Sequence, residues 1–198
     1  MTTTGAEIQE LINEVKSLRN EVGYLRDRQA ILDVLSRQSR GHDRHDAPLQ
    51  NSCFWEDGFD EHGPWVTPGS RYGEWANETH SGSYSAHMHN LTTHTCEIDG
   101  DTAHAESYVV GLFQPRNKPG RAQFMTARYI DRLEKRNGEW RILARRTVIE
   151  IVLEGDSEWA GGPYSGAFPK GTWDESDLSY TRPLKIDSVA PFWDGTTR

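Results

Sequence analysis

The sequence has no surplus of basic residues. Its 198 residues include 22 Lys and Arg against 30 Asp and Glu, for a net charge of −8. Proteins that bind nucleic acid neutralise phosphates with clustered Lys and Arg. We therefore expect no nucleic-acid partner.

Long hydrophobic runs and cysteines are scarce too. No segment approaches the ~18 apolar residues of a membrane span, and the first residues, "MTTTGAEIQELINEVKSL", lack the pattern of a secretory signal. We expect a cytoplasmic protein without a membrane partner. Cys53 and Cys96 are far apart and lack CxxC spacing, so we expect buried free thiols rather than a disulfide framework or a zinc ribbon.

Several motifs that carry common chemistries are missing. The sequence contains no G-x-G-x-x-G after a predicted strand, no G-x-x-x-x-G-K-[ST], no G-x-S-x-G and no H-E-x-x-H. Dinucleotide, nucleotide, serine-hydrolase and zincin chemistry are therefore unsupported. The length suits one domain with an appendage.

The N-terminal residues carry an apolar seam whose spacing alternates between three and four, which is typical of a coiled coil. The seam consists of Ile8, Leu11, Val15, Leu18, Val22 and Leu25. We predict a helical arm over residues 1–24 that packs on a partner subunit. The helical pattern continues and stops at "RGHDRHDAPLQ", where Gly41 and Pro48 break it.

Strand patterns dominate the second half of the chain. Residues 86–98 and 102–113 flank Asp99-Gly100, and residues 121–135 and 139–153 flank Asn137-Gly138. Both dipeptides favour hairpin turns. Two long hairpins after a helical segment predict an α+β domain with a curved antiparallel sheet, over residues 25–154. The segment before them, residues 51–83, indicates irregular structure with short helical or strand pieces.

The last segment, residues 155–198, is rich in Gly, Pro and aromatic residues without periodicity. Its large rings are too many for a typical solvated tail, so we predict an ordered extension over the domain or a neighbour, which could serve as a lid. These rings are Trp159, Tyr164, Phe168, Trp173, Tyr180, Phe192 and Trp193.

Three histidines lie close together in the predicted strand "SAHMHNLTTHTCEIDG". Strand alternation places His87 and His89 on one face, with Thr93, and His94 on the other. A cupin-type metal site needs a carboxylate a few residues on, whereas Glu97 lies eight positions after His89. The pattern therefore favours a catalytic histidine over a metal site, with structural or surface histidines as the alternative.

Arginine and aspartate supply the other candidates. On "WRILARRTVIEIV", Arg145 and Arg146 lie on opposite, mostly apolar faces. At least one must be embedded and must pair with a buried acid or a substrate oxygen. At the helix end "RGHDRHD", Asp43 and Asp46 suit caps or turns, but a carboxylate that meets an imidazole also orients it as a base.

Three segments in order resemble the SnoaL-like branch of the nuclear-transport-factor-2-like superfamily. They are "LRDRQAILDVLSRQSRGHDRHD", "HNLTTHTCEIDGDTAHAESY" and "RYIDRLEKRNGEWRILARR". The resemblance implies a cone-shaped α+β barrel, with helices packed in a strongly curved antiparallel sheet and an apolar pocket at one end. Relatives include scytalone dehydratase, bile-acid 7α-dehydratase, hexachlorocyclohexane dehydrochlorinase, steroid isomerase-like proteins and lyases that release formaldehyde from lignin-derived diaryl compounds. These work without metal or organic cofactor.

By position, the resemblance implies that Asp43, His89 and Arg145 are catalytic. His89 would be the base, Asp43 would orient it, and Arg145 would hold an oxygen or leaving group as negative charge develops. Two positions depart from the family pattern: Gln38 replaces a pocket Tyr or Lys, and Thr93 replaces an Asn.

These observations predict a cofactor-independent lyase for a hydrophobic aromatic or polycyclic molecule, such as a lignin-derived diaryl compound. A double-bond isomerase would use the same groups. The alternatives are a non-catalytic small subunit of a ring-hydroxylating dioxygenase and a ligand-binding module. We expect a homo-oligomer, a trimer rather than a dimer as in the dehydratase relatives. The predicted substrate-binding residues are Gln38, Trp55, Trp65, Tyr108, Phe124 and Tyr129.

Overall fold

A computed structural model describes residues 4–158, 162–166 and 168–184. Helices pack against one curled six-stranded sheet of order β2-β1-β6-β5-β4-β3. Neighbouring strands are antiparallel except β1 and β6, which are parallel. The predicted α+β class is therefore confirmed. None of the described helices is both long and apolar enough to cross a membrane.

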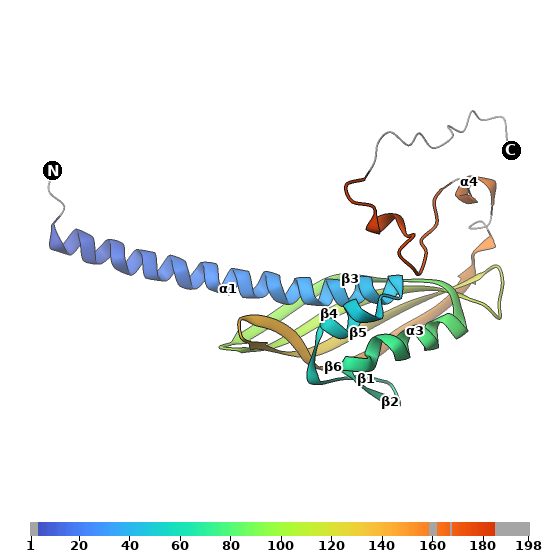
Figure 1. Cartoon of the computed structure of the whole chain (residues 1–198), viewed down its shortest axis with the longest axis horizontal. Coiled ribbons are helices and arrows are strands. Elements are labelled where there is room, and N and C mark those ends of the chain that lie inside the picture. The colour runs from blue at the N-terminus through green and yellow to red at the C-terminus, as the bar shows by residue number, and fades with distance from the viewer. Residues whose placement is uncertain (1–3, 159–161, 167, 185–198) are drawn as a thin grey trace.

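A single long helix, α1 (Gly5–Arg44), spans the predicted arm and enters the domain. Thr4 and Glu7 form a capping box at its start, and His45 ends it in the left-handed conformation with φ of 54°. At 1.5 Å per residue its 40 residues extend about 60 Å. The N-terminal half projects beyond the sheet, and burial begins near Asp27 (Figure 1).

Short elements connect α1 to the long strands. They are α2 (Ala47–Ser52), β1 (Phe54–His62), β2 (Trp65–Pro68), a 3-10 turn η1 (Gly69–Arg71) and α3 (Tyr72–Ser83). Helix α3 lies so close to α2 that a Cβ on Gly73 would come within 2.5 Å of the Ala47 Cα. Glycine at this position therefore lets α3 approach α2.

The four predicted strands are present and slightly longer than expected. They are β3 (Tyr84–Asp99), β4 (Thr102–Pro115), β5 (Arg121–Arg136) and β6 (Glu139–Asp156). Asn137 and Gly138 both have positive φ, as a type I′ turn requires. The first hairpin turns one residue later than predicted: Asp99 pairs with Thr102, and Gly100 supplies the positive φ.

The predicted facing of His94 is wrong because β3 contains a bulge. Leu91 pairs with Val109 and His94 with Ser107, so two β3 residues oppose one β4 residue. Beyond the bulge the alternation is inverted, which leaves Thr93 exposed. His94 instead points inward, where its Nδ1 lies 2.9 Å from the Ser107 Oγ.

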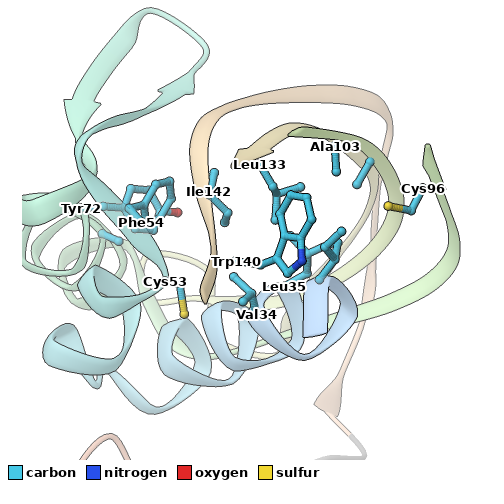
Figure 2. Close-up of a cluster of buried hydrophobic side chains, with 13 residues drawn as sticks. Val34, Leu35, Cys53, Phe54, Tyr72, Cys96, Ala103, Leu133, Trp140 and Ile142 are labelled. Carbon is cyan, nitrogen blue, oxygen red and sulfur yellow. The ribbon is translucent and has the colours of Figure 1, made fainter. Parts of the chain in front are cut away.

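The main core forms where the buried end of α1 meets the inner face of the sheet (Figure 2). Trp140 is 2% exposed between Leu35 of α1 and Leu133 of β5. Its indole N–H donates to the Asp27 Oδ1 over 2.9 Å, which ties α1 to β6. The two cysteines are buried free thiols, as predicted.

Part of the C-terminal extension lies over the end of α1 in the same chain (Figure 1). Its described elements are α4 (Pro163–Gly166) and the 3-10 turn η3 (Leu178–Tyr180). The Tyr180 hydroxyl donates to Asp46 over 3.0 Å, and the Trp173 ring stacks on His45 at 3.9 Å. Of the predicted aromatic residues, Trp159, Phe192 and Trp193 lie outside the described residues, as does the side chain of Tyr164.

Candidate active site

A cavity of about 180 Å³ opens at the end of the cone where α3 covers the curled sheet. Its walls are mainly apolar, and several polar side chains reach into it. The lining residues are His62, Trp65, Trp75, Thr79, His80, Ser83, Tyr84, His89, Val109, Gly111, Phe113, Met125, Ala127, Tyr129, Thr147 and Ile149. Apolar walls with a few converging polar groups are typical of small-molecule sites.

Asp43 and His89 meet at the edge of this cavity. The Nδ1 of His89 lies 2.7 Å from the Asp43 Oδ1, and the backbone N–H of His89 lies 3.0 Å from both carboxylate oxygens. The carboxylate can only accept, so we assign the proton to Nδ1. This tautomer leaves Nε2 as the acceptor of His89, and His89 is one of the residues that line the cavity. An oriented imidazole with a free Nε2 is suited to remove a proton.

Four more histidines surround this pair. His42, His45, His80 and His87 come from α1, the helix cap, α3 and β3. Burial lowers the pKa of all four, and repulsion from neighbouring histidines lowers them further. For His45 the pKa falls to about 4. At neutral pH these rings are therefore uncharged.

Arg145 does not line the cavity. Its guanidinium is 1% exposed and donates to both oxygens of Asp131, over 2.7 and 3.0 Å, and to the Gln38 Oε1 over 2.6 Å. Asp131 lies directly opposite Arg145 in the β5–β6 ladder, which fixes the pairing. Burial alone would lower the pKa of Arg145, but the charge and hydrogen bonds of Asp131, together with the nearby Tyr129 and Asp60, outweigh burial and raise it.

These contacts decide between the two alternatives for the embedded arginine in favour of a buried ion pair. The predicted contact of Arg145 with a substrate oxygen is not supported, because Arg145 does not line the cavity and three of its N–H groups already donate to Asp131 and Gln38. Arg145 reaches the cavity only indirectly: its guanidinium lies 4.1 Å from the ring centre of Tyr129, which lines the cavity.

The predicted substrate-binding residues divide by strand face. Trp65 and Tyr129 line the cavity. Tyr108 and Phe124 are 47% and 38% exposed and are not among the lining residues, because they alternate with the inward-facing residues of β4 and β5.

The other two predicted residues are also away from the cavity. Trp55 donates to the Glu134 carbonyl over 2.9 Å, and its ring lies 4.9 Å from the guanidinium carbons of both Arg136 and Arg141. Gln38 is fully buried against Arg145. These two side chains therefore support the fold around the site without lining the cavity.

A second histidine–carboxylate pair was missed by the sequence analysis. His62 lines the cavity, and its Nδ1 lies 3.4 Å from the Asp60 Oδ1 and 3.2 Å from the Thr147 Oγ1. Asp60 is fully buried. The two residues alternate on "FDEH", which predicts one shared strand face. That signal was present, but the segment was predicted to be largely irregular.

The SnoaL-like domain matches residues 23–146 of the chain. No curated protein sequence matches it. Among solved structures, the hexachlorocyclohexane dehydrochlorinase LinA-type3 from Novosphingobium barchaimii LL02 is similar, with a TM-score of 0.64 and 20% identity over 68% of this chain and 94% of the other.

Two further structures are similar. A candidate scytalone dehydratase from Novosphingobium aromaticivorans DSM 12444 has a TM-score of 0.59 and 16% identity, covering 66% of this chain and 88% of the other. A single-residue variant of Rv3472, a protein of unknown function from Mycobacterium tuberculosis, has a TM-score of 0.57 and 26% identity, covering 65% and 74%. Identities of 16 and 20% establish a shared fold only.

Proposed function

The chain belongs to the SnoaL-like family of the nuclear-transport-factor-2-like superfamily, and from this premise we propose that it is a lyase for a hydrophobic ring compound. The chain is similar in fold to a hexachlorocyclohexane dehydrochlorinase and to a candidate scytalone dehydratase. Both names describe an elimination. The reaction class of these two neighbours supports the proposal of a lyase.

One observation carries the proposal: the 2.7 Å contact between His89 and Asp43 beside an apolar cavity. In the proposed reaction the Nε2 of His89 takes a proton from a substrate carbon or hydroxyl. The electron pair of the broken bond forms the new double bond, and the leaving group departs with its own pair. Asp43 orients the imidazole of His89 and stabilises its protonated, charged form.

A poor leaving group such as hydroxide must be protonated as it departs. We assign the donation of that proton to His62. In the sheet three strands separate β1, which carries His62, from β3, which carries His89, yet the sheet curls so that both line one cavity. The base and the proton donor can therefore act on different ends of one substrate.

The cavity favours a substrate that inserts one ring. Its volume is about 180 Å³, and a cavity of ~150 Å³ is enough for benzene. Val109, Phe113 and Ala127 form apolar walls, and the partly exposed Trp65 stands at the rim. A diaryl compound would place its second ring outside the cavity against Trp65.

We also propose that the protein is a homo-oligomer, a trimer rather than a dimer. The apolar seam of α1 is exposed along its whole length, with values between 45% at Val15 and 61% at Leu25. Tyr108 and Leu112 add exposed apolar surface on the outer face of the sheet. Large exposed apolar surfaces of this kind are typical of protein interfaces.

The test is turnover by the EDTA-treated full-length chain on paired ring substrates that differ only in the leaving group, chloride or hydroxyl, together with diaryl compounds that can release formaldehyde. We expect one class to turn over, and His89→Ala to lower its kcat by about 10²–10⁴-fold. His62→Gln should slow the hydroxyl substrate more than the chloride one, because chloride leaves without protonation.

Three outcomes would overturn the proposal. Turnover that survives His89→Ala would exclude His89 as the base. Turnover that needs added metal would exclude catalysis by side chains alone. If no substrate turns over although the ring compounds bind, the ligand-binding module gains support, and if none binds, the structural subunit does.

A further inference from the structure

We propose that His42, His80 and His87 form a binding site for a divalent transition-metal ion, with Zn²⁺ as the best fit. One ring nitrogen from each lies within 4.8 Å of the other two. The three come from the end of α1, from α3 and from β3. The proposal concerns ion binding alone, so it stands or falls independently of the proposed lyase activity.

The state of His42 is the strongest argument. Its side chain is 1% exposed, and neither ring nitrogen has a hydrogen-bond partner among the residues that the structure describes. A buried polar group without a partner is costly and calls for a bound water or ion. Three other imidazole rings lie close to His42: the ring centres are 4.4 Å away for both His80 and His89 and 5.4 Å away for His87.

The hydrogen bond of His87 prepares it as a ligand. Its Nε2 lies 3.0 Å from the backbone carbonyl of His42, which can only accept, so the proton sits on Nε2. The Nδ1 lone pair then faces the cluster. Metal-binding histidines almost always donate their second N–H to a carbonyl or carboxylate in this way.

His80 completes the group. Its Nδ1 lies 3.0 Å from the Nδ1 of His87. A tetrahedral Zn²⁺ with Zn–N bonds of about 2.0–2.1 Å holds its ligand nitrogens about 3.3–3.4 Å apart, so this pair needs little movement. Because His80 also lines the cavity, a fourth position on the ion would face the cavity.

The ligand chemistry selects the kind of ion. Three imidazoles suit Zn²⁺, Co²⁺, Ni²⁺ or Cu²⁺, whereas Mg²⁺ and Ca²⁺ require oxygen ligands. Zn²⁺ is the best fit because it accepts a tetrahedral site with three histidines and one open position.

A competing group consists of Asp43, His87 and His89, whose possible ligand atoms also lie within 4.8 Å of one another. It is the weaker candidate, because Asp43 already accepts from the backbone and the ring of His89. The Nε2 of His87, which lies 4.0 Å from Asp43, already donates to the His42 carbonyl. An ion there would compete with the hydrogen bonds of Asp43 to His89 and of His87 to the His42 carbonyl, whereas the three-histidine site replaces one contact, between the Nδ1 atoms of His80 and His87, and satisfies the unpartnered His42.

The experiment measures binding and coordination in the EDTA-treated full-length protein. Isothermal titration with Zn²⁺ should give one ion per chain. X-ray absorption of the zinc-loaded protein should report three imidazoles at about 2.0–2.1 Å. Co²⁺ loading should produce the strong visible bands of a four-coordinate ion.

Variants locate the site. His80→Phe keeps an aromatic ring at this position and should weaken Zn²⁺ binding by at least about 100-fold. Asp43→Asn should retain binding although the proposed function requires it to lose turnover. His104→Ala, which removes an exposed histidine on β4, should change nothing. His80 is preferred to His42, whose burial makes its substitution a risk to the fold.

The outcomes are distinct. The absence of stoichiometric binding, or equal loss in His104→Ala and His80→Phe, would overturn the proposal. A loss confined to Asp43→Asn, or an absorption spectrum that requires a carboxylate ligand, would place the ion in the competing group. A loss of turnover in Asp43→Asn without loss of zinc would support both proposals separately.

Discussion

At the scale of single residues, the site depends on which polar side chains find partners. A family resemblance predicted that Asp43 orients His89. In the structure the Asp43 Oδ1 lies 2.7 Å from the His89 Nδ1. Strand alternation predicted that at least one arginine of β6 is embedded, and Arg145 is. The ion-pair partner of Arg145 could not be predicted, because the sequence of one strand does not determine the β5–β6 register that places Asp131 opposite Arg145.

The buried pair predicts a stability effect for Arg145. We expect Arg145→Met to lower the free energy of unfolding by roughly 3–5 kcal/mol, because it leaves the Asp131 carboxylate buried without its cation. Urea denaturation followed by circular dichroism would measure this. The double variant Arg145→Met/Asp131→Leu should recover much of the loss, since a well-packed apolar pair replaces the ions.

The neighbouring arginine supplies the control. Arg146→Met makes the same change one residue later, at a side chain that is 66% exposed and pairs with Glu61. We expect it to change stability by no more than about 0.5 kcal/mol. Equal stability of the two single variants would contradict the assignment of Arg145 to a structural ion pair.

At the scale of elements, two features could not be predicted from the sequence: the bulge in β3 and the packing of α3 against the end of α1. The bulge between Leu91 and His94 inverts the facing of β3, and no residue type in "LTTH" marks it. The histidine cluster forms because α3 brings His80 to the end of α1, far along the chain from His42. Local spacing cannot reveal a contact that packing creates.

The C-terminal extension should detach from α1 in acid. Burial raises the pKa of Asp177, but hydrogen bonds from the side chain and backbone N–H of Ser179 and from the backbone N–H of Thr172, with the charge of Arg44, outweigh burial and lower the pKa to about 2. The unfolded value is about 3.9, so this carboxylate stabilises the docked segment above about pH 4 and its contribution is lost between about pH 4 and 2. Hydrogen exchange of residues 168–184, corrected for intrinsic rates, would follow the transition.

The same detachment should appear at neutral pH in Asp177→Asn, which removes the charge. Asp174→Asn is the matched control, because Asp174 is exposed and its side chain contacts only Thr172 and Ser176 of the same turn among the described residues. Protection that is equally lost in both variants would mean that the turn, and not the contact with α1, holds the segment.

At the scale of the whole molecule, the long α1 predicts how copies associate. Leu18→Glu places a charge in the apolar seam and should shift the oligomer towards smaller species, because a charge at a coiled-coil core position is unfavourable. Ser17→Glu adds the same charge outside the seam and should leave the mass unchanged. Light scattering would compare them, and a wild-type monomer would contradict the proposed association.

The cone fold and its cavity were predictable because the order of helix and hairpins is legible in the sequence and matches the family. The side chains that line the cavity were harder to predict. Of the six predicted substrate-binding residues, Trp65 and Tyr129 line the cavity, since side-chain direction depends on bulges and register that periodicity does not give. His62 and His80 entered the site through the same tertiary effects.

The most direct test of the central claim is the kcat of Asp43→Asn against wild type on a substrate that the wild-type protein turns over. The substitution keeps the size of the side chain, removes its negative charge and replaces one of its two acceptor oxygens with an NH2 donor, so the carboxylate no longer fixes the His89 tautomer. We predict a loss in kcat of about 10²–10⁴-fold with an unchanged unfolding midpoint. An Asp43→Asn variant that retains wild-type kcat would contradict the claim that the Asp43–His89 pair is the base of this site.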